Sequence, residues 1–418
     1  MLEELHLKEV GPAPTLAIEL KSRINILAGD NGLGKTFLLD VGWWALTRTW
    51  ARGLAMPHLP PAEPEIRFRY TQSSTGSYRY SSTFNRETEK WSVQQGRPPI
   101  PGLVLYAQVD GGFSVWDPAR NYWKKEDPDR PSSYLFSAQE VWEGNRYCEG
   151  LIRDWASWQR EGGEAFEELQ QVLQTLAPSE NEPLEPGELR KVFLDDARRY
   201  PTLRMPYGQE VAVIHASAGM RRIIALAYLL VWAWQEHLAT CQLRGSKPTR
   251  EIIFLIDEIE AHLHPQWQRR IVPALTEVMN ALTGENDAQV QLIAATHSPL
   301  VLASIEPQFD PEVDAVFHLN LAEGGVELQE EPWAKQGDVV GWLVSDIFGL
   351  RQGRSLEAER AIEAAEAWMR EDLSALPPGL SSPEEIHQEL ERVLAGHDPF
   401  WPRWIVWTER HDQQEVNA

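Results

Sequence analysis

The sequence of 418 residues contains little cysteine and lacks a long apolar run. Its two cysteines, Cys148 and Cys241, lie far apart in the chain, which excludes a disulfide framework and a cysteine-based zinc site. No run of about 18 apolar residues is present, so no membrane-spanning segment or membrane partner is expected. The first ten residues, MLEELHLKEV, do not have the pattern of a signal peptide. These features favour a reducing cytoplasm.

Basic charge is also scarce. The chain has 39 Lys and Arg against 62 Asp and Glu, which gives a formal net charge of −23 at pH 7. Proteins that wrap DNA non-specifically usually present a basic surface, because neutralised phosphates supply most of that affinity. A DNA-binding surface is therefore expected only as a local patch.

Tryptophan is abundant, with 18 residues. We expect them to pack in the core; the alternative is that some of them form a partner surface, where tryptophan is enriched.

Apolar periodicity indicates an α/β fold in four segments. Residues 1–109 are expected to form a first lobe that ends in an antiparallel β meander (EIRFRY, SYRYSSTF, KWSVQ and GLVLYAQV), and residues 110–210 a mainly helical inserted arm. Residues 211–334 return to α/β character. Their apolar strands EIIFLI and QLIA suit a sheet that is covered on both faces. Residues 335–418 are expected to be a helical C-terminal extension.

A phosphate-binding loop follows the strand that ends near residue 28. Residues 29–36 read GDNGLGKT and match the pattern G-x-x-x-x-G-K-[ST] completely. Glycines in such a loop let backbone N–H groups cradle phosphate oxygens at the start of a helix. The residues expected to contact the nucleotide are Asn31, Gly32, Gly34, Lys35, Thr36 and Phe37. Lys35 would reach the β- and γ-phosphates, and the Thr36 hydroxyl would ligate Mg²⁺.

Two acidic residues close the strand Ile252–Ile256. Asp257 and Glu258 follow this apolar run directly, so they are expected at the carboxyl end of a central strand, where ligands bind in open α/β sheets. Asp257 would hold Mg²⁺. Glu258 would act on the attacking water as a general base or orient it.

The segment HASAGMRR at 215–222 precedes a long apolar helix about 35 residues before Asp257. It resembles the signature motif of ABC ATPases, in which a helix start offers N–H groups and a serine hydroxyl to a γ-phosphate. The resemblance implies that Ser217 and Gly219 act in trans on nucleotide held by a second subunit. The sequence departs from the LSGGQ pattern at Ala216 and Met220.

Two further segments resemble parts of the same site. The segment ATHSP follows the strand QLIA, and the resemblance makes His297 the switch histidine, which contacts a γ-phosphate or the attacking water. Gln108 is the candidate for the glutamine that senses Mg²⁺. His264 stands where many ABC ATPases have an acid, a departure shared by many SMC-like and OLD-like ATPases.

The resemblance covers about residues 1–50, 100–110 and 211–320 and is closest to the soluble RecF, SMC and OLD ATPases. It implies an ABC-ATPase P-loop fold with a mixed sheet, ATP and Mg²⁺ as cofactors, catalysis by Lys35, Glu258 and His297, and a homodimer closed around ATP. Short tail segments, SDIFGLR and DPFWPRW, resemble the ATPase subunits of Septu-type and retron-associated anti-phage systems. That likeness implies an effector partner such as an HNH-type nuclease.

Other functions fit the same motifs. A RecF-like DNA-repair ATPase would bind DNA directly, with Arg198, Arg199 and Arg204 gathered on one face. A nucleotide-gated scaffold would bind ATP and turn it over slowly. The aromatic tail residues must be buried either on the chain's own ATPase lobe or in the groove of a partner; they are Phe400, Trp401, Trp404 and Trp407.

Overall fold

The computed structural model describes residues 1–60, 62–72, 76–93, 100–121, 131–284, 288–322 and 324–417. It divides into two compact units, Met1–Gly337 and Asp338–Ala418. The first unit contains both α/β lobes and the arm between them. The second contains the helical extension.

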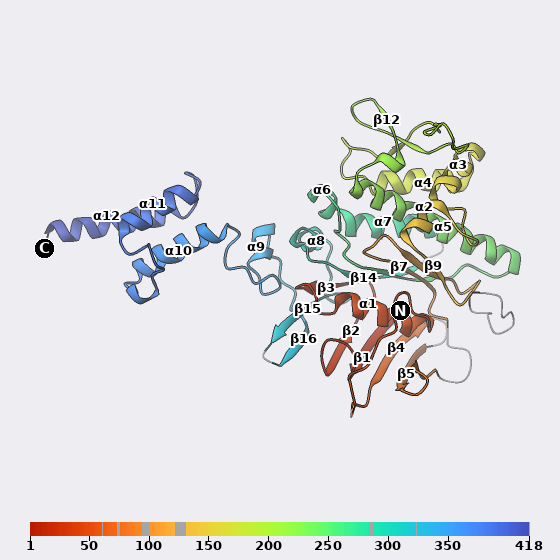
Figure 1. Cartoon of the computed structure of the whole chain (residues 1–418), viewed down its shortest axis with the longest axis horizontal. Coiled ribbons are helices and arrows are strands. Elements are labelled where there is room, and N and C mark those ends of the chain that lie inside the picture. The colour runs from red at the N-terminus through yellow and green to blue at the C-terminus, as the bar shows by residue number, and fades with distance from the viewer. Residues whose placement is uncertain are drawn as a thin grey trace. The chain divides into compact units, whose positions relative to one another are not determined.

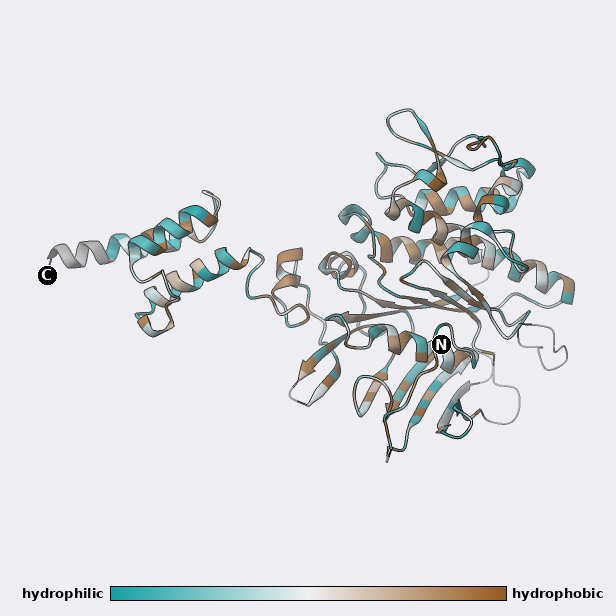
Figure 2. Cartoon of the chain, in the orientation of Figure 1, coloured by the Kyte–Doolittle hydropathy of each residue, from teal (hydrophilic) through white to brown (hydrophobic). Residues whose placement is uncertain are grey.

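A mixed eight-stranded sheet forms the centre of the first unit (Figure 1), in the order β16-β15-β3-β14-β13-β7-β8-β9. The five strands from β15 to β7 run parallel, and antiparallel strands complete both edges. The bounds are β3 Ile24–Gly29, β7 Leu103–Ala107, β8 Phe113–Trp116, β9 Tyr134–Phe136, β13 Glu251–Ile256, β14 Gln289–Ala295, β15 Asp314–Ala322 and β16 Gly325–Glu330. The central strands are strongly apolar (Figure 2), as expected for strands covered on both faces.

A second, antiparallel sheet lies on the other side of helix α1 (Lys35–Thr47), which is sandwiched between the two sheets (Figure 1). Its order is β2-β1-β4-β5-β6, with bounds β1 Leu2–Lys8, β2 Thr15–Glu19, β4 Glu65–Gln72, β5 Gly76–Asn85 and β6 Lys90–Trp91. One core joins α1 to both sheets through Trp43 and Trp44 and fixes the helix that follows the phosphate loop. The expected meander is therefore real over β4, β5 and β6.

The segment GLVLYAQV does not belong to that meander, which corrects the expectation from the sequence. Its residues form β7, a central strand that pairs in parallel with β13 and has all five residues buried. An uninterrupted apolar run is typical of a strand covered on both faces, whereas a meander strand alternates. The strand end at Ala107 is thereby placed beside the strand end at Ile256.

The segment 110–210 is less helical than expected. It begins with β8 and β9, which extend the central sheet. The helices α2 (Ala138–Glu143), α3 (Leu151–Glu161) and α4 (Glu164–Thr175) then follow. A small three-stranded sheet completes it, with bounds β10 Glu185–Pro186, β11 Thr202–Arg204 and β12 Glu210–Ala212. The inserted arm thus starts after β9, and the expected boundary at 110 falls inside the sheet.

The long helix α5 (Ala218–Arg244) packs against α3, α4 and α7 on the face of the central sheet opposite α1 (Figure 1). By length and composition it is the one helix among the described residues that could cross a membrane, and most of its apolar stretch is buried inside the unit. It serves here as a core helix. The remaining helices are α6 Pro265–Gln268, α7 Ile271–Thr283 and α8 Pro299–Ile305.

The second unit is a small helical assembly with its own core. Its helices are α9 Val339–Leu343, α10 Leu356–Met369, α11 Pro383–Val393 and α12 Trp401–Asn417. Phe400 and Trp404 are buried against the alanine-rich face of α10 and against α11, and the Trp404 indole N–H donates to His387 Nδ1 at 3.0 Å. Trp401 and Trp407 are partly buried beside them. The aromatic tail thus packs within its own unit, so neither the ATPase lobe nor a partner is needed to bury Phe400 and Trp404.

Candidate nucleotide-binding site

The phosphate loop joins β3 to α1 and has the backbone that its glycines allow. Gly32 and Gly34 adopt φ angles of 80° and 101°, in the left-handed region that favours glycine. A Cβ on Gly34 would also lie 2.6 Å from Cγ of Pro12. The first hydrogen bond of α1 runs from Leu38 N–H to Gly34 C=O at 2.9 Å. The N–H groups of the three preceding residues, including Phe37, therefore remain available to an anion at the helix start.

Lys35 is buried under this loop. Its ammonium donates to the carbonyl oxygens of Gly29 at 2.8 Å and Asp30 at 2.7 Å. Burial lowers the pKa of Lys35, although Glu258 and neighbouring acids act in the opposite direction. When nucleotide binds, phosphate oxygens would replace the Gly29 and Asp30 carbonyls as acceptors for the Lys35 ammonium, which the fold already holds in place.

Thr36 and Asp257 meet where the phosphate loop faces the end of β13. The Thr36 hydroxyl lies 2.9 Å from Asp257 Oδ1 and 3.0 Å from Oδ2, and Asp257 is fully buried. A hydroxyl beside a carboxylate supplies the hard oxygen donors that Mg²⁺ prefers. The residues present therefore fit a magnesium ion, with nucleotide phosphates and water as its other ligands.

A partly buried polar group, made of Arg52, Asp40 and Tyr106, contacts Asp257. Arg52 reaches Asp257 Oδ2 at 3.3 Å, Asp40 Oδ1 at 3.1 Å and the Tyr106 hydroxyl at 2.7 Å. The Tyr106 hydroxyl in turn donates to Asp40 at 3.0 Å. Burial raises the pKa of Asp40 and that of Tyr106. These residues fix the Asp257 carboxylate, and the sequence analysis did not identify them because they come from three separate elements.

Glu258 has a strained backbone, with φ at 45° in the left-handed region. Non-glycine residues hold such angles at a cost of order 1–3 kcal/mol, and the strain is common at functional sites. Arg222 stabilises this turn by donating to the carbonyls of Asp257 and Glu258, each at 2.9 Å, and to that of Val109 at 2.9 Å. Burial lowers the pKa of Arg222. Arg222 was noted only as part of the signature segment, yet it joins three loops of the site.

His297 follows β14 and is held by Glu260. The two carboxylate oxygens of Glu260 accept from the Thr296 hydroxyl at 2.7 Å and from the His297 N–H at 2.5 Å. The Ser298 hydroxyl donates to Gln268 at 2.7 Å. The turn after β13 therefore determines where the histidine segment lies. Glu260 could have been suspected as a third acid after the strand, but only the fold shows its partners.

The signature segment begins α5 as expected. Ser217 is the N-cap, and its exposed hydroxyl accepts from Met220 N–H at 3.3 Å. Gly219 is buried, and a Cβ there would lie 2.6 Å from the His262 carbonyl oxygen. In this chain Gly219 is required for a close approach between two backbones. Its action on nucleotide, like that of Ser217, stays a prediction.

Gln108 follows β7 and lies beside Asp257, because the Asp257 N–H donates to the Ala107 carbonyl at 2.9 Å. Its amide N–H donates to the Ser114 hydroxyl of β8 at 2.9 Å. This bond uses the amide nitrogen, whereas Mg²⁺ would be bound through the amide oxygen. Gln108 also lines a cavity of about 550 Å³ between its own turn, the start of α5 and the segment 259–263.

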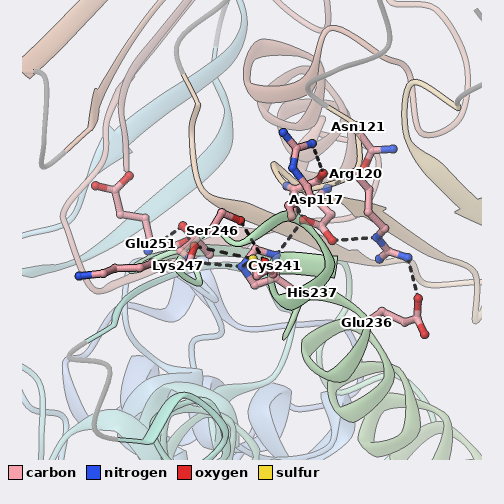
Figure 3. Close-up of polar contacts among 12 residues, drawn as sticks. Asp117, Arg120, Asn121, Glu236, His237, Cys241, Ser246, Lys247 and Glu251 are labelled. Atoms are coloured by element: carbon pink, nitrogen blue, oxygen red, sulfur yellow. Dashed lines mark hydrogen bonds and ion pairs between the residues drawn. The ribbon is translucent and has the colours of Figure 1, made fainter. Parts of the chain in front are cut away.

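A second polar cluster is buried where the C-terminal part of α5 meets the turn after β8 (Figure 3). His237 Nδ1 lies 2.8 Å from Asp117, and its Nε2 accepts from the Thr249 N–H at 3.0 Å, so the proton belongs on Nδ1. Burial alone would raise the pKa of Asp117, but the hydrogen bond from His237 and the charge of Arg120 lower it. Cys241 lies 3.5 Å from His237, and burial raises the pKa of its thiol. This cluster joins α5 to the turn after β8 and to the loop before β13. A reactive thiol would need exposure and a lowered pKa, so Cys241 has a structural role here.

The arginines expected to gather for DNA are largely paired. Arg198 binds Asp196 and Glu143, and Arg204 lies 3.6 Å from Glu185. Neighbouring acids thus offset the charge of Arg198 and of Arg204, while Arg199 is exposed.

The mixed sheet with its parallel centre, the phosphate loop after β3 and the acidic pair after β13 are those of an ABC-type ATPase. The sequence matches the family described as "AAA domain, putative AbiEii toxin, Type IV TA system" over residues 24–303, more than half of the chain. The chain belongs to this family.

Its relatives include proteins named for Septu and for retrons. Over 163 residues it is 31% identical to "Septu protein PtuA" of Bacillus mycoides (strain KBAB4), a match that covers 39% of this chain and 20% of that protein. Over 124 residues it is 31% identical to "Retron Vc95 probable ATPase" of Vibrio cholerae serotype O1 biovar El Tor, which covers 28% of this chain and 22% of that protein. The chain thus spans about a fifth of the length of these relatives.

Among solved structures, the chain is similar to the SMC head domain from Thermotoga maritima, with a TM-score of 0.41 and 13% identity over 79% of this chain and 99% of that one. It is also similar to "the recombination mediator protein RecF-ATPrS in RecFOR pathway", with a TM-score of 0.39 and 13% identity over 79% of this chain and 98% of that one.

Proposed function

We propose that this protein binds and hydrolyses ATP-Mg²⁺ between two copies of itself, in the cytoplasm, and that its nucleotide state controls a partner effector of an anti-phage defence system. The observation that carries the proposal is the contact between Thr36 and Asp257, at 2.9 and 3.0 Å, below the loop that holds Lys35. A phosphate cradle, a cation and a magnesium site then converge at one edge of the sheet.

In this mechanism the chain binds the nucleotide before it acts on it. The N–H groups at the start of α1 and the Lys35 ammonium hold the phosphates, while Thr36 and Asp257 would hold Mg²⁺, which neutralises phosphate charge when bound. Glu258 accepts a proton from the attacking water or orients it, and His297, positioned by Glu260, contacts the γ-phosphate. Ser217 of the second copy closes the site. The γ-phosphate can shift the open–closed balance only by its greater affinity for the closed form, and contacts made across the dimer supply that difference.

The effector role rests on resemblance. The relatives named for Septu and retron systems support a defence function, and the helical unit Asp338–Ala418, which contributes none of the residues assigned to the nucleotide site, could bind a partner. An HNH-type nuclease is the partner that the resemblance favours.

The first test measures molecular mass by light scattering with and without ATP-Mg²⁺ for Glu258→Gln, together with ATP turnover of the wild-type chain. We expect turnover in the wild type, loss of turnover in Glu258→Gln, and an ATP-dependent dimer of that variant. Unchanged turnover in Glu258→Gln would show that another group activates the water. Dimerisation with ATP-Mg²⁺ together with very slow ATP turnover by the wild-type chain would favour a nucleotide-gated scaffold.

The partner is tested by purifying the chain together with the products of neighbouring genes. Co-purification of a nuclease-like protein in a defined ratio supports the effector function. A chain that stays alone and gains salt-sensitive DNA affinity with ATP would instead indicate a repair ATPase that contacts DNA directly.

A further inference from the structure

Two exposed apolar loops flank the two halves of the nucleotide site. One loop carries Phe193 and Leu194, which are 46% and 91% exposed, and the other carries Met56 and Leu59, which are 60% and 85% exposed. Large apolar side chains at this exposure mark an interaction surface when they lie together.

The first loop adjoins the signature segment. The Phe193 ring makes an edge contact with the ring of His215, with centroids 6.4 Å apart, and His215 precedes the N-cap Ser217 by two residues. Phe193 also packs edge-on against Tyr200, which is buried. Leu194 is thus presented by an anchored aromatic residue next to the exposed start of α5.

The second loop adjoins the phosphate loop. His58 donates its N–H to the Glu9 carbonyl at 2.8 Å, and its Nε2 lies 2.8 Å from the Gly11 carbonyl oxygen. The neighbouring Pro12 lies so close to Gly34 that a Cβ there would be 2.6 Å from the proline ring. Leu59 thus follows a residue that contacts Gly11, and Pro12, the next residue after Gly11, contacts Gly34, the N-cap of α1.

We infer that Phe193 and Leu194 of one copy pack against Met56 and Leu59 of a second copy when ATP closes the dimer. The inference rests on the proposed sandwich, in which the signature segment of one subunit faces the phosphate loop of the other. Two-fold symmetry then brings the loop beside Ser217 towards the loop beside Gly34, twice per dimer. A second copy of the chain would cover both exposed apolar loops, which explains why one such loop borders each half of the site.

Charge supports the same pairing. Asp195 follows Leu194 and is exposed. Arg86 is exposed beside Leu59, because its guanidinium donates to the carbonyls of His58 at 2.8 Å and Ala62 at 3.2 Å. Opposite charges at the rim of an apolar contact favour an arrangement in which the Leu194 loop meets the Leu59 loop over one in which each loop meets its own copy.

The test is a cross-link between copies. Leu59→Cys and Leu194→Cys are each made with Glu258→Gln, mixed, and treated with a short bis-maleimide in the presence and absence of ATP-Mg²⁺. The native Cys148 and Cys241 are buried, so the introduced thiols are the ones that react. Leu243→Cys, at a position 89% exposed at the far end of α5, is the matched control for Leu194→Cys.

We expect an ATP-dependent cross-link for the 59–194 pair and none above background for the 59–243 pair. In a separate measurement, Leu194→Ala with Glu258→Gln should bind nucleotide as a monomer with unchanged affinity but dimerise roughly tenfold to a hundredfold more weakly, since each 1.4 kcal/mol of lost burial is about tenfold in affinity.

Failure takes two distinguishable forms. If Glu258→Gln dimerises with ATP, but the 59–194 pair does not cross-link and Leu194→Ala dimerises normally, the loop pairing is wrong and the sandwich stands. If Glu258→Gln binds ATP and stays a monomer, the sandwich itself is wrong and the loop pairing falls with it. Weaker association of Leu194→Ala with the co-purified effector, beside normal dimerisation, would assign the loop to that partner and overturn the inference.

Discussion

Replacing Gly219 by alanine tests the close approach between the start of α5 and the turn that follows β13. A Cβ on Gly219 would lie 2.6 Å from the His262 carbonyl oxygen, which is far inside ordinary van der Waals contact. The turn cannot retreat easily: His262 has a φ of 63°, and the Leu263 N–H donates to the Glu260 carbonyl at 2.9 Å. Either the helix start or the turn that holds Glu260 must shift.

The expected change combines two opposing terms. Glycine to alanine in a helix is favourable by roughly 0.5–1 kcal/mol. Overpacking against backbone costs roughly 1–3 kcal/mol. We therefore expect Gly219→Ala to lower the free energy of unfolding by up to about 2.5 kcal/mol. Because the same turn positions His297 through Glu260, ATP turnover should fall as well.

The assay is urea denaturation followed by tryptophan fluorescence, with Gly42→Ala as the matched control. Gly42 lies inside α1, and its Cβ would find Leu2 at 3.7 Å, an ordinary contact. That variant should be more stable than the wild type by about 0.5–1 kcal/mol. If Gly219→Ala is stabilised to the same extent as Gly42→Ala, the backbone approach does not constrain the site, and the reasoning is wrong.

Three further predictions concern charge and packing. Burial raises the pKa of Asp154 to about 6, so the folded carboxyl binds its proton more tightly than the unfolded one and stability falls as pH rises from about 4 through 6. Asp154→Asn should therefore raise the free energy of unfolding by about 1–2 kcal/mol at pH ~7.5 and by about a third of that at pH ~4.5, where the folded carboxyl keeps its proton. An equal difference at both pH values would contradict this origin. Lys35→Ala should weaken nucleotide binding, measured by calorimetry, roughly tenfold to a hundredfold through the loss of a charged hydrogen-bond donor, whereas Lys90→Ala, at an exposed position in β6, should leave it unchanged. Trp404→Ala should destabilise the C-terminal unit by roughly 3–5 kcal/mol and make it sensitive to limited proteolysis. Ile405→Ala, at the half-exposed neighbouring residue, should leave the proteolysis pattern unchanged. Equal sensitivity of both variants would show that the unit has no fixed core around Trp404.

Strand assignments show where sequence patterns succeed and where they fail. The phosphate loop and the strand ending at Ile256 lie where the sequence predicted them, because glycines, apolar runs and terminal acids act on their immediate neighbours. The strand Leu103–Ala107 was assigned to the wrong sheet, since its partner β13 lies about 150 residues further along the chain and the apolar run alone does not name that partner.

The same division applies to the site. The sequence by itself determined the class of chemistry, because a phosphate cradle with its lysine and the Asp–Glu pair at a strand end are local arrangements of a few consecutive residues. Only the tertiary structure decided how these groups are held: Arg222 joins three loops, Arg52 supports Asp257, and Gly219 is fixed by a carbonyl from another segment. The reason is physical. Burial, hydrogen-bond geometry and steric contact depend on which distant segments meet, and that meeting is a property of the whole packed core.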